Sequence, residues 1–207
     1  MFSKFLSLDP DRRNALFNAA LREFASKGFD DASTNVIAKE SGISKPLMFH
    51  YVRNKKDFFL FLYDHCLEII NREYFDQINV HEKDIFERLR QTCLLKINLL
   101  RKHPWIFDFV KVAVFTESEA VKEDLKERRE MVEAGVYKRF YGDIDTSRFR
   151  GQLDIERAKQ LIYWAVSGYA GEILEQLRGA DSSEFDLEKI RAEFDIYLNE
   201  LRKTYYK

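Results

Sequence analysis

Apolar residues recur at three- and four-residue spacing along most of the chain, which is the pattern of amphipathic helices. The spacing predicts a first helix over about residues 11–27. Its apolar positions are Leu16, Phe17, Ala20, Leu21 and Phe24. Asp9 and Pro10 precede it as helix-starting residues, and Gly28 follows it as a helix-ending residue. Phe29, just beyond the glycine, is expected to pack back on Phe24.

Two shorter helices are predicted next, joined by a turn of about three residues centred on Gly42. Ser33 and Thr34 begin the first of them, and Ser44 begins the second, which runs to about Val52. Two short helices joined in this way form a helix-turn-helix. Four apolar residues are spaced so as to seal a small core between them: Ile37, Ile43, Met48 and Val52.

The rest of the chain continues the helical spacing. Further helices are predicted at about 55–77, 82–102, 118–141 and 184–203, with a short aromatic segment at 105–115 and a loop at 141–151. The last helix is apolar at Leu187, Ile190, Phe194, Leu198 and Leu201. Three prolines and eight glycines are too few for the frequent turns of a β-sandwich or barrel. The expected fold class is all-α, with about nine helices.

The penultimate helix differs from the others because residues 161–171 carry no charge over three helical turns. A helix with one apolar face would show charges at every turn, so this one is expected to be covered all round. Ala165, Gly168 and Gly171 are small enough for another helix to approach closely. Either the subunit's own core surrounds this helix, or a partner subunit covers part of it.

Composition and charge exclude several classes of protein. Cys66 and Cys93 lie within apolar helical patterns without metal-ligand spacing, and the four histidines are scattered, so neither a disulfide framework nor a metal site is expected. No secretory signal, membrane span or catalytic motif is visible, which predicts a cytoplasmic protein that is not an enzyme and needs no cofactor. The net charge is −1, yet residues 1–60 carry ten Lys and Arg against seven Asp and Glu. The N-terminal region is therefore the part expected to face phosphate.

A resemblance to a known family adds to this picture. Its residues run from Gly28-Phe29 through Ser33-Thr34, Ile37-Ala38 and Ser41-Gly42-Ile43-Ser44-Lys45-Pro46-Leu47-Met48-Phe49-His50-Tyr51-Val52 to Asn54-Lys55. This stretch resembles the DNA-binding domain of the tetracycline-repressor (TetR) family, over roughly residues 11–60. The resemblance implies a helix-turn-helix DNA-binding domain at 1–54 and a helical domain for effector binding and dimerisation at 55–207.

Such a motif places its second short helix in the DNA major groove, with the N-terminal residues near the bases. Lys45 is expected to donate to guanine, and Pro46 to meet a thymine methyl group. Leu47 and Phe49 depart from the family, which often carries a hydroxyl at each position, so Leu47 is expected to make an apolar base contact or none. The remaining expected DNA contacts, mostly to phosphate, are made by Thr34, Asn35, His50, Tyr51 and Lys55. Tyr51 is equally compatible with packing between helices.

The resemblance also implies a homodimer, in which the last two helices pair with the same two of a second chain. Candidate interface residues are Ala165, Gly168, Tyr169, Phe194, Leu198 and Leu201. It further implies a pocket for an unidentified apolar or aromatic small-molecule effector. Candidate pocket residues are Trp105, Phe107, Phe109, Tyr163 and Trp164, although an ordinary aromatic core would explain the same residues.

The leading hypothesis is therefore a repressor whose homodimer binds a palindromic DNA operator and is released by the effector. Two alternatives stay open. One is a helix-turn-helix regulator controlled by a protein partner. The other is a helical small-molecule-binding protein whose DNA-binding end has degenerated, as the two lost hydroxyls would allow.

Overall fold

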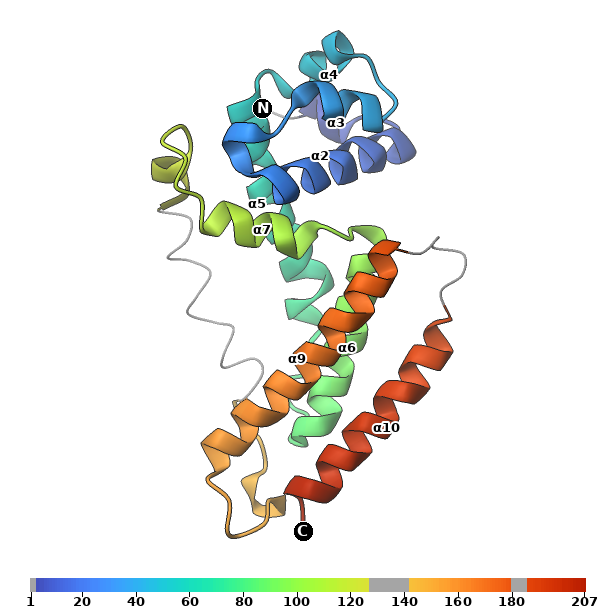
Figure 1. Ribbon diagram of the computed structural model, residues 1–207, viewed down its shortest axis with the longest axis vertical. Coiled ribbons are helices and arrows are strands. Elements are labelled where there is room, and N and C mark those ends of the chain that lie inside the picture. The colour runs from blue at the N-terminus through green and yellow to red at the C-terminus, as the bar shows by residue number, and fades with distance from the viewer. Residues whose placement is uncertain (1–2, 127–141, 180–185) are drawn as a thin grey trace. The chain divides into compact units, whose positions relative to one another are not determined.

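The computed structural model describes residues 3–126, 142–179 and 186–207 (Figure 1). Within these residues the chain forms the nine α-helices and two short 3₁₀-helices named below, a further helical stretch at residues 122–126, and no β-strand. The prediction of an all-α fold is confirmed. The helices divide into two compact units: unit 1 comprises residues 1–70 and 105–133, and unit 2 comprises residues 71–104 and 134–207.

Unit 1 contains the N-terminal helices together with one helix from the middle of the chain. They are α1 (Ser3–Leu6), α2 (Pro10–Asp31), α3 (Thr34–Glu40), α4 (Lys45–Val52), α5 (Lys55–Glu73) and α7 (Ile106–Val114). The residues of α5 after Ile70 belong to unit 2. α2 is the centre of the unit, since it packs against both α3 and α7.

The predicted limits of the first helix hold at its start and change at its end. The Asp9 carboxylate accepts hydrogen bonds from the backbone N–H groups of Asp11 and Arg12, which caps α2 as the sequence indicated. Gly28 breaks the helical backbone with φ of 71°, a conformation that favours glycine, and one more turn follows to Asp31. After the break at Gly28, the Phe29 ring stacks on the Phe24 ring with centroids 6.5 Å apart, which confirms their predicted contact.

An aromatic cluster around Phe24 forms the core of unit 1. The Phe24 ring lies 4.9 Å from Phe59, 6.1 Å from Phe109 and 6.5 Å from Phe58, measured between centroids. Phe24, Phe58, Phe59 and Phe109 are all fully buried. α7 therefore completes the hydrophobic core of the helix-turn-helix unit, because Phe109 faces α2 and α5 from the same side as its neighbours Ile106 and Ala113.

Polar contacts tie the segment after α7 to the same unit. The Ser118 hydroxyl donates to the Asp30 carboxylate at 2.8 Å, and the Lys56 ammonium pairs with Asp124 at 2.8 Å. Packing thus joins α5 and α7 to the first four helices, whereas the sequence predicted a domain boundary after residue 54. The division into a DNA-binding domain at 1–54 and an effector-binding and dimerisation domain at 55–207 stays a prediction.

Unit 2 consists of three long helices and the loops at their ends. The elements are η1 (Phe75–Gln77), α6 (Ile85–Lys102), η2 (Thr146–Arg148), α9 (Ile155–Gly179) and α10 (Leu187–Tyr205). α6 packs against both α9 and α10, which also pack against each other (Figure 1). The Arg90 guanidinium on α6 holds the Asp195 carboxylate on α10 through two hydrogen bonds, of 2.5 and 2.9 Å.

Arg88 lies fully buried at the start of α6 and is held by backbone carbonyls. Its guanidinium donates to Val80 O at 2.9 Å, to Glu82 O at 2.8 Å and to Gly142 O at 2.5 Å. Burial lowers the pKa of this guanidinium from its usual value. The carbonyls compensate the lost hydration of the cation, and the arginine in return fixes the loop before α6.

Several predicted helix limits need correction. The helix predicted over 55–77 ends at Glu73, where a separate 3₁₀ turn follows, and the one predicted over 82–102 begins only at Ile85 because Asp84 is its cap. The predicted loop at 141–151 contains η2. Residues 127–141 of the helix predicted over 118–141 lie outside the described residues. α1 was not predicted from the sequence at all.

Candidate nucleic-acid interface

The turn between α3 and α4 is built by Gly42. Its φ of 70° is in the region that favours glycine, and it allows two hydrogen bonds to close the end of α3. Gly42 N–H donates to Lys39 O at 3.2 Å, and Ile43 N–H donates to Ala38 O at 3.1 Å. The chain then leaves α3 in a new direction, and α4 begins two residues after Ile43.

A small set of apolar side chains locks α3 and α4 together. Ile37 and Ala38 of α3 and Met48 and Val52 of α4 are all buried, as the spacing predicted, and Ile43 is half-buried. With these residues turned inward, the opposite side of α4 is left in solvent. The packing therefore presents one side of a short helix, which is what a helix-turn-helix requires.

Lys45, Pro46 and Leu47 form the exposed N-terminal turn of α4. The Ser44 hydroxyl accepts a hydrogen bond from Leu47 N–H and fixes the start of the helix. The Lys45 ammonium lies 5.9 Å from the centroid of the half-buried Phe49 ring, four residues on. Leu47 keeps 38% of its surface exposed, so part of its isobutyl group faces solvent.

Thr34 and Asn35 lie in the first turn of α3, with Thr34 half-buried and Asn35 exposed. Ser33 stands at the cap position as predicted, but its side chain makes no capping hydrogen bond. Its backbone N–H instead donates to the Glu23 carboxylate of α2 at 2.8 Å. This contact sets the position of the α3 N-terminus relative to α2.

Lys55 is placed differently from the other candidate DNA contacts. Its ammonium donates to the carbonyl oxygen of Asp30 at 2.9 Å and lies 5.0 Å from the centroid of the Phe29 ring. Both partners belong to the end of α2. Lys55 therefore stabilises the junction of α2 and α5, and its predicted role in binding phosphate stays a prediction.

His50 and Tyr51 occupy the second half of α4, where His50 is exposed and Tyr51 is half-buried. Their two rings meet edge to face, with centroids 5.5 Å apart. Lys4 of α1, a residue that sequence reasoning missed, places its ammonium 3.4 Å from His50 Nε2. The sequence signal that could have indicated an ordered segment here was Phe5, an apolar residue that precedes the α2 cap. In the structure Phe5 is fully buried. The α4 side of unit 1 thus gathers Lys4, Lys45 and His50 around exposed polar and apolar groups.

The five candidate pocket residues are divided between the two units. In unit 1, Phe109 is part of the aromatic core, while Trp105 and Phe107 are half-buried. In unit 2, Tyr163 and Trp164 are both exposed. Two pockets are described next, and neither is lined by any of these five residues. The predicted effector pocket stays a prediction.

An apolar groove of about 370 Å³ runs between α9 and α10. Its lining residues are Ala165, Val166, Tyr169, Glu172, Phe194, Tyr197, Leu198, Glu200, Leu201 and Thr204. Tyr169 stacks on Phe194 with centroids 5.1 Å apart and donates its hydroxyl to Ile190 O at 3.2 Å. Five of the six candidate interface residues line this groove, and the sixth, Gly168, lies on the neighbouring turn of α9.

Exposed apolar residues border the groove. Leu161, Trp164, Ala165 and Gly168, which we call the α9 strip, follow the i, i+3, i+4, i+7 spacing of one helix face, and all four are exposed. Trp164 keeps 60% of its surface exposed, and on α10 Ile196 keeps 63% and Tyr197 51%. Of the two alternatives left open by the sequence, complete cover of this helix by the subunit's own core does not hold for the described residues, because one side of α9 is exposed.

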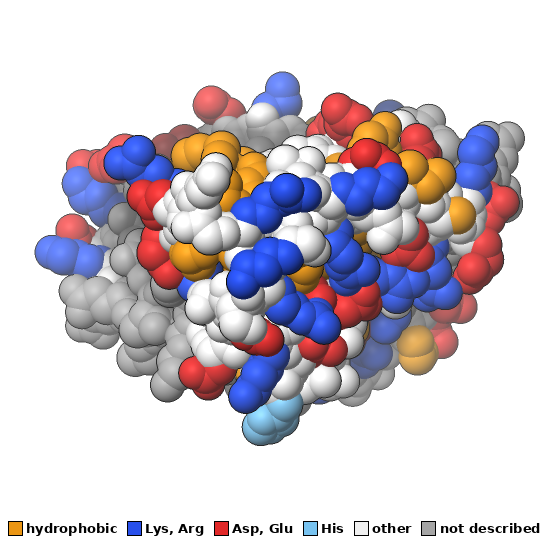
Figure 2. All heavy atoms as spheres, turned by 90° about the horizontal axis from the view of Figure 1, so that it is seen from below, with side chains coloured by type: hydrophobic (Ala, Val, Ile, Leu, Met, Phe, Trp, Pro, Cys, Tyr) orange, Lys and Arg blue, Asp and Glu red, His pale blue; other side chains and the backbone are white. Residues whose placement is uncertain are grey.

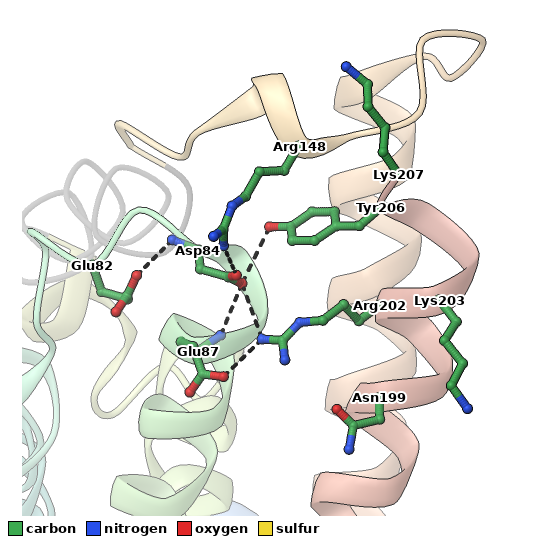
Figure 3. A pocket seen from close by; sticks show the side chains of 9 residues that line it. All are labelled: Glu82, Asp84, Glu87, Arg148, Asn199, Arg202, Lys203, Tyr206 and Lys207. Carbon is green, nitrogen blue, oxygen red and sulfur yellow. Dashed lines mark hydrogen bonds and ion pairs between the residues drawn. The ribbon is translucent and has the colours of Figure 1, made fainter.

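A second pocket, of about 930 Å³, lies where α6 begins and α10 ends (Figure 3). Asp84 is at its centre: the carboxylate caps α6 and receives Arg148, Arg202 and the Tyr206 hydroxyl. Arg202 also donates to Glu87 at 2.8 Å. Burial raises the pKa of Tyr206 to about 12, so its hydroxyl stays a donor to this carboxylate at neutral pH. This network joins three segments of unit 2 by ion pairs.

Figure 2 views the molecule from the side of the C-terminus, where Lys and Arg side chains alternate with Asp and Glu. In residues 3–126, 142–179 and 186–207 no group of three or more His, Cys, Asp or Glu side chains is arranged to hold a metal ion. Among the described helices, none combines the length and the apolar character that crossing a membrane requires.

Comparison with known proteins agrees with this geometry. Residues 16–61 match the family model of bacterial regulatory proteins of the tetR family. No curated protein matches the chain. The fold is similar to a TetR family transcriptional regulator from Chloroflexus aurantiacus, with a TM-score of 0.61 and 19% identity, covering 99% of this chain and 98% of that chain.

A TetR family transcription regulator from Marinobacter aquaeolei is also similar, with a TM-score of 0.50 and 18% identity, covering 95% of this chain and 96% of that chain. Because both similarities span nearly the whole length of each protein, they extend the likeness from residues 16–61 to the complete helical fold. Residues 16–61 thus match the model of the tetR family of bacterial regulatory proteins, and the chain as a whole has the fold of two TetR family transcriptional regulators.

Proposed function

We propose that this protein is a homodimeric transcriptional repressor that binds a palindromic operator through α4 and is released by a small-molecule effector. The observation that carries the proposal is the exposed N-terminal turn of α4, fixed by the Gly42 turn and by the buried contacts of Met48 and Val52. A short helix presented in this way fits the major groove of B-DNA. Because its ligand is DNA, the protein is expected to act in the cytoplasm.

Within this proposal Lys45 donates to guanine, while Pro46 and Leu47 make apolar contact with base edges. Thr34, Asn35, His50, Tyr51 and Lys55 position the domain on the phosphates, and Phe49 packs beneath Lys45. Few of these contacts read the sequence directly. A second copy of the same helix, one DNA turn or more away, is therefore needed for a specific operator.

The α9–α10 face supports the dimer. The α9 strip and the exposed side chains of Ile196 and Tyr197 form an apolar surface beside the groove. A Cβ atom added at Gly168 or Gly171 would meet no atom within 4 Å beyond the neighbouring backbone of its own helix, so these glycines leave room for a second helix to approach. A two-fold pairing of α9 and α10 with their copies would cover this surface with itself.

Release by an effector requires that ligand binding changes the position of α4. α5 is the connection we propose, because it starts directly after α4 and its last residues belong to unit 2. An effector that binds the conformation unable to bind DNA more tightly, by about 1–3 kcal/mol, would lower operator affinity by the corresponding factor. The effector is expected to be apolar or aromatic, and its pocket to lie in residues 55–207.

Fluorescence anisotropy with the duplex that lies upstream of the protein's own gene tests the proposal, measured at two salt concentrations beside random DNA. A dimer should bind the upstream duplex at least about 1,000-fold more tightly than the random duplex. The matched variant Lys45→Ala should lose most of this preference. Equal, weak binding of both duplexes by the wild-type protein would contradict a specific operator in that region.

The effector is tested on the same complex. A library of apolar and aromatic acids, amines and alcohols is added to the bound dimer, and a fall in anisotropy identifies a releasing ligand. If a ligand verified by calorimetry binds the dimer and operator affinity stays the same at saturation, release by that ligand is excluded.

A further inference from the structure

The segment before α2 is firmly attached to unit 1. Phe5 of α1 is fully buried, with its ring centroid 5.2 Å from that of Phe61 and 6.0 Å from that of Phe58. The Arg13 guanidinium of α2 donates to Leu6 O at 2.8 Å. These contacts hold α1 on both sides, so its one lysine has a defined position.

That position is beside α4. The Lys4 ammonium lies 3.4 Å from Nε2 of His50, and both side chains are exposed. Neither of them forms an ion pair with a carboxylate in the part of the chain that the structure describes. A lysine ammonium has three N–H donors, and contact with one imidazole nitrogen occupies one of them.

The free donors point to an anionic ligand, and their place on α4 indicates which one. His50 follows Lys45 by five residues, or about 7.5 Å along the helix axis. When the N-terminal turn of such a helix reaches base edges, its later residues lie toward the wall of the groove, which is made of phosphates. A lysine acts there as a point charge on a phosphate oxygen.

We propose that Lys4, held beside His50 by the buried Phe5, binds a backbone phosphate of the operator and so adds α1 to the DNA interface. The proposal rests on the proposed function in that α4 must enter the major groove. It adds a contact from outside the helix-turn-helix, and it predicts that this contact is independent of base sequence.

The test compares Lys4→Gln with Lys111→Gln in the full-length dimer. Lys111 is a suitable control because it is an exposed lysine of the same unit on α7, which Figure 1 shows on the other side of α2 from α3 and α4. Affinity for the operator and for random DNA is measured over a series of salt concentrations. Melting temperatures and circular dichroism spectra confirm that both variants are folded.

Lys4→Gln should raise the dissociation constant about 3- to 10-fold on both duplexes, leaving their ratio unchanged. It should also reduce the slope of log K against log salt by about 0.9 for each protomer bound. Lys111→Gln should change neither quantity. In a series of operators, one phosphate at a time is replaced by a neutral methylphosphonate. At one position per half-site, this replacement should weaken DNA binding by the wild-type protein and leave DNA binding by Lys4→Gln unchanged.

A wild-type slope for Lys4→Gln, or the absence of any such methylphosphonate position, would overturn the phosphate contact. Failure of the proposed function has a different signature: the wild-type protein itself would not distinguish the operator from random DNA. In that case the salt slopes on random DNA still decide whether Lys4 binds phosphate. A wild-type protein that binds no DNA at any salt concentration would overturn both proposals.

Discussion

The two exposed surfaces of this protein differ in chemistry. The α4 side of unit 1 shows the cations Lys4 and Lys45 and the imidazole of His50, beside Pro46 and Leu47. The α9–α10 face of unit 2 shows large apolar side chains, with Trp164, Ile196 and Tyr197 each more than half exposed. A polyanion is attracted by charge and stays hydrated, whereas an apolar surface is stabilised only by removal from water. The two surfaces are thus suited to partners of opposite kinds.

The largest expected effect comes from placing a charge on the α9–α10 face. Trp164→Glu would bury a carboxylate without a partner in the proposed dimer and should raise the dimer dissociation constant by at least about 100-fold. Operator affinity should fall with it, because the two copies of α4 would no longer be linked. Analytical ultracentrifugation measures the first effect and anisotropy the second.

Asn199→Glu is the matched control for this variant. Asn199 is exposed on α10 and lines the polar pocket at the end of unit 2, on a different side of the helix from the apolar groove. The same added charge should leave the dimer intact there. Dissociation of both variants, or of neither, would remove the distinction between the two sides of α10.

A smaller effect separates two lysines of unit 1. Lys45→Ala should cost about 1–3 kcal/mol of operator binding and relax base specificity, with no loss of thermal stability, since among the described residues its ammonium contacts only the Phe49 ring. Lys55→Ala should lower the free energy of unfolding by about 1 kcal/mol, because the bond to Asp30 O and the contact with Phe29 are lost.

Lys55→Ala is also expected to weaken binding to all DNA sequences alike and to flatten the salt dependence. Urea titrations and DNA titrations of both variants check these expectations. An unchanged unfolding free energy for Lys55→Ala would show that its contacts in unit 1 contribute nothing to stability.

Acid should weaken the contact between α6 and α10 before it affects the apolar face. The bidentate hydrogen bond from Arg90 lowers the pKa of the Asp195 carboxyl. A lowered pKa in the folded state means that this carboxylate stabilises the fold above its unfolded pKa of about 4, and that the contribution is lost as pH falls through the folded pKa. Because both side chains are about one-third exposed, the contribution is at most about 1 kcal/mol.

Asp195→Asn should therefore reduce stability at pH 7 and leave it nearly unchanged at pH 2, as measured by urea unfolding. Glu188→Gln is the control, since Glu188 is exposed, pairs with Arg191 on the same helix and lines neither of the two pockets described above. A difference at pH 2 as large as the one at pH 7 would mean that the loss does not come from the carboxylate charge.

The smallest expected effect concerns the two buried cysteines, which should not react with an alkylating reagent while the protein is folded. Cys66 on α5 and Cys93 on α6 are both buried, and burial raises the pKa of the Cys93 thiol to about 12 and that of Cys66 well above its usual value. Neither thiol should react with iodoacetamide at pH 8 in the folded protein, and both should react in urea. Rapid labelling of one cysteine under native conditions would show that the surrounding core opens readily.

Local sequence signals were sufficient to predict the features of the fold that depend on single residues. Gly28 and Gly42, predicted as a helix end and the centre of a turn, both take a positive φ, and Ile37, Met48 and Val52 are buried as their spacing indicated. Placement was predicted less well, because it depends on contacts between distant residues. Trp105, Phe107 and Phe109 read as one aromatic segment, yet nothing in their spacing shows that Phe109 packs against Phe24, 85 residues earlier.

The candidate DNA contacts illustrate the same limit. Spacing and caps located Lys45 at the start of α4, where the structure has it, but the contact of Lys55 with Asp30 O depends on how α2 and α5 meet. The uncharged run at 161–171 correctly marked an unusual helix. It did not show on which side other helices of the same chain would cover it.

The position of Phe109 also bears on how the protein is made. During synthesis the first four helices leave the ribosome well before α7, yet the rings of Phe24 and Phe59 gain Phe109 as an aromatic neighbour only when residue 109 has emerged. A nascent chain that ends at residue 70 contains every element of the helix-turn-helix and lacks part of its hydrophobic core. Folding of the DNA-binding end is therefore completed only after α7 has been translated, and an expression fragment of this domain needs α7 as much as it needs α4.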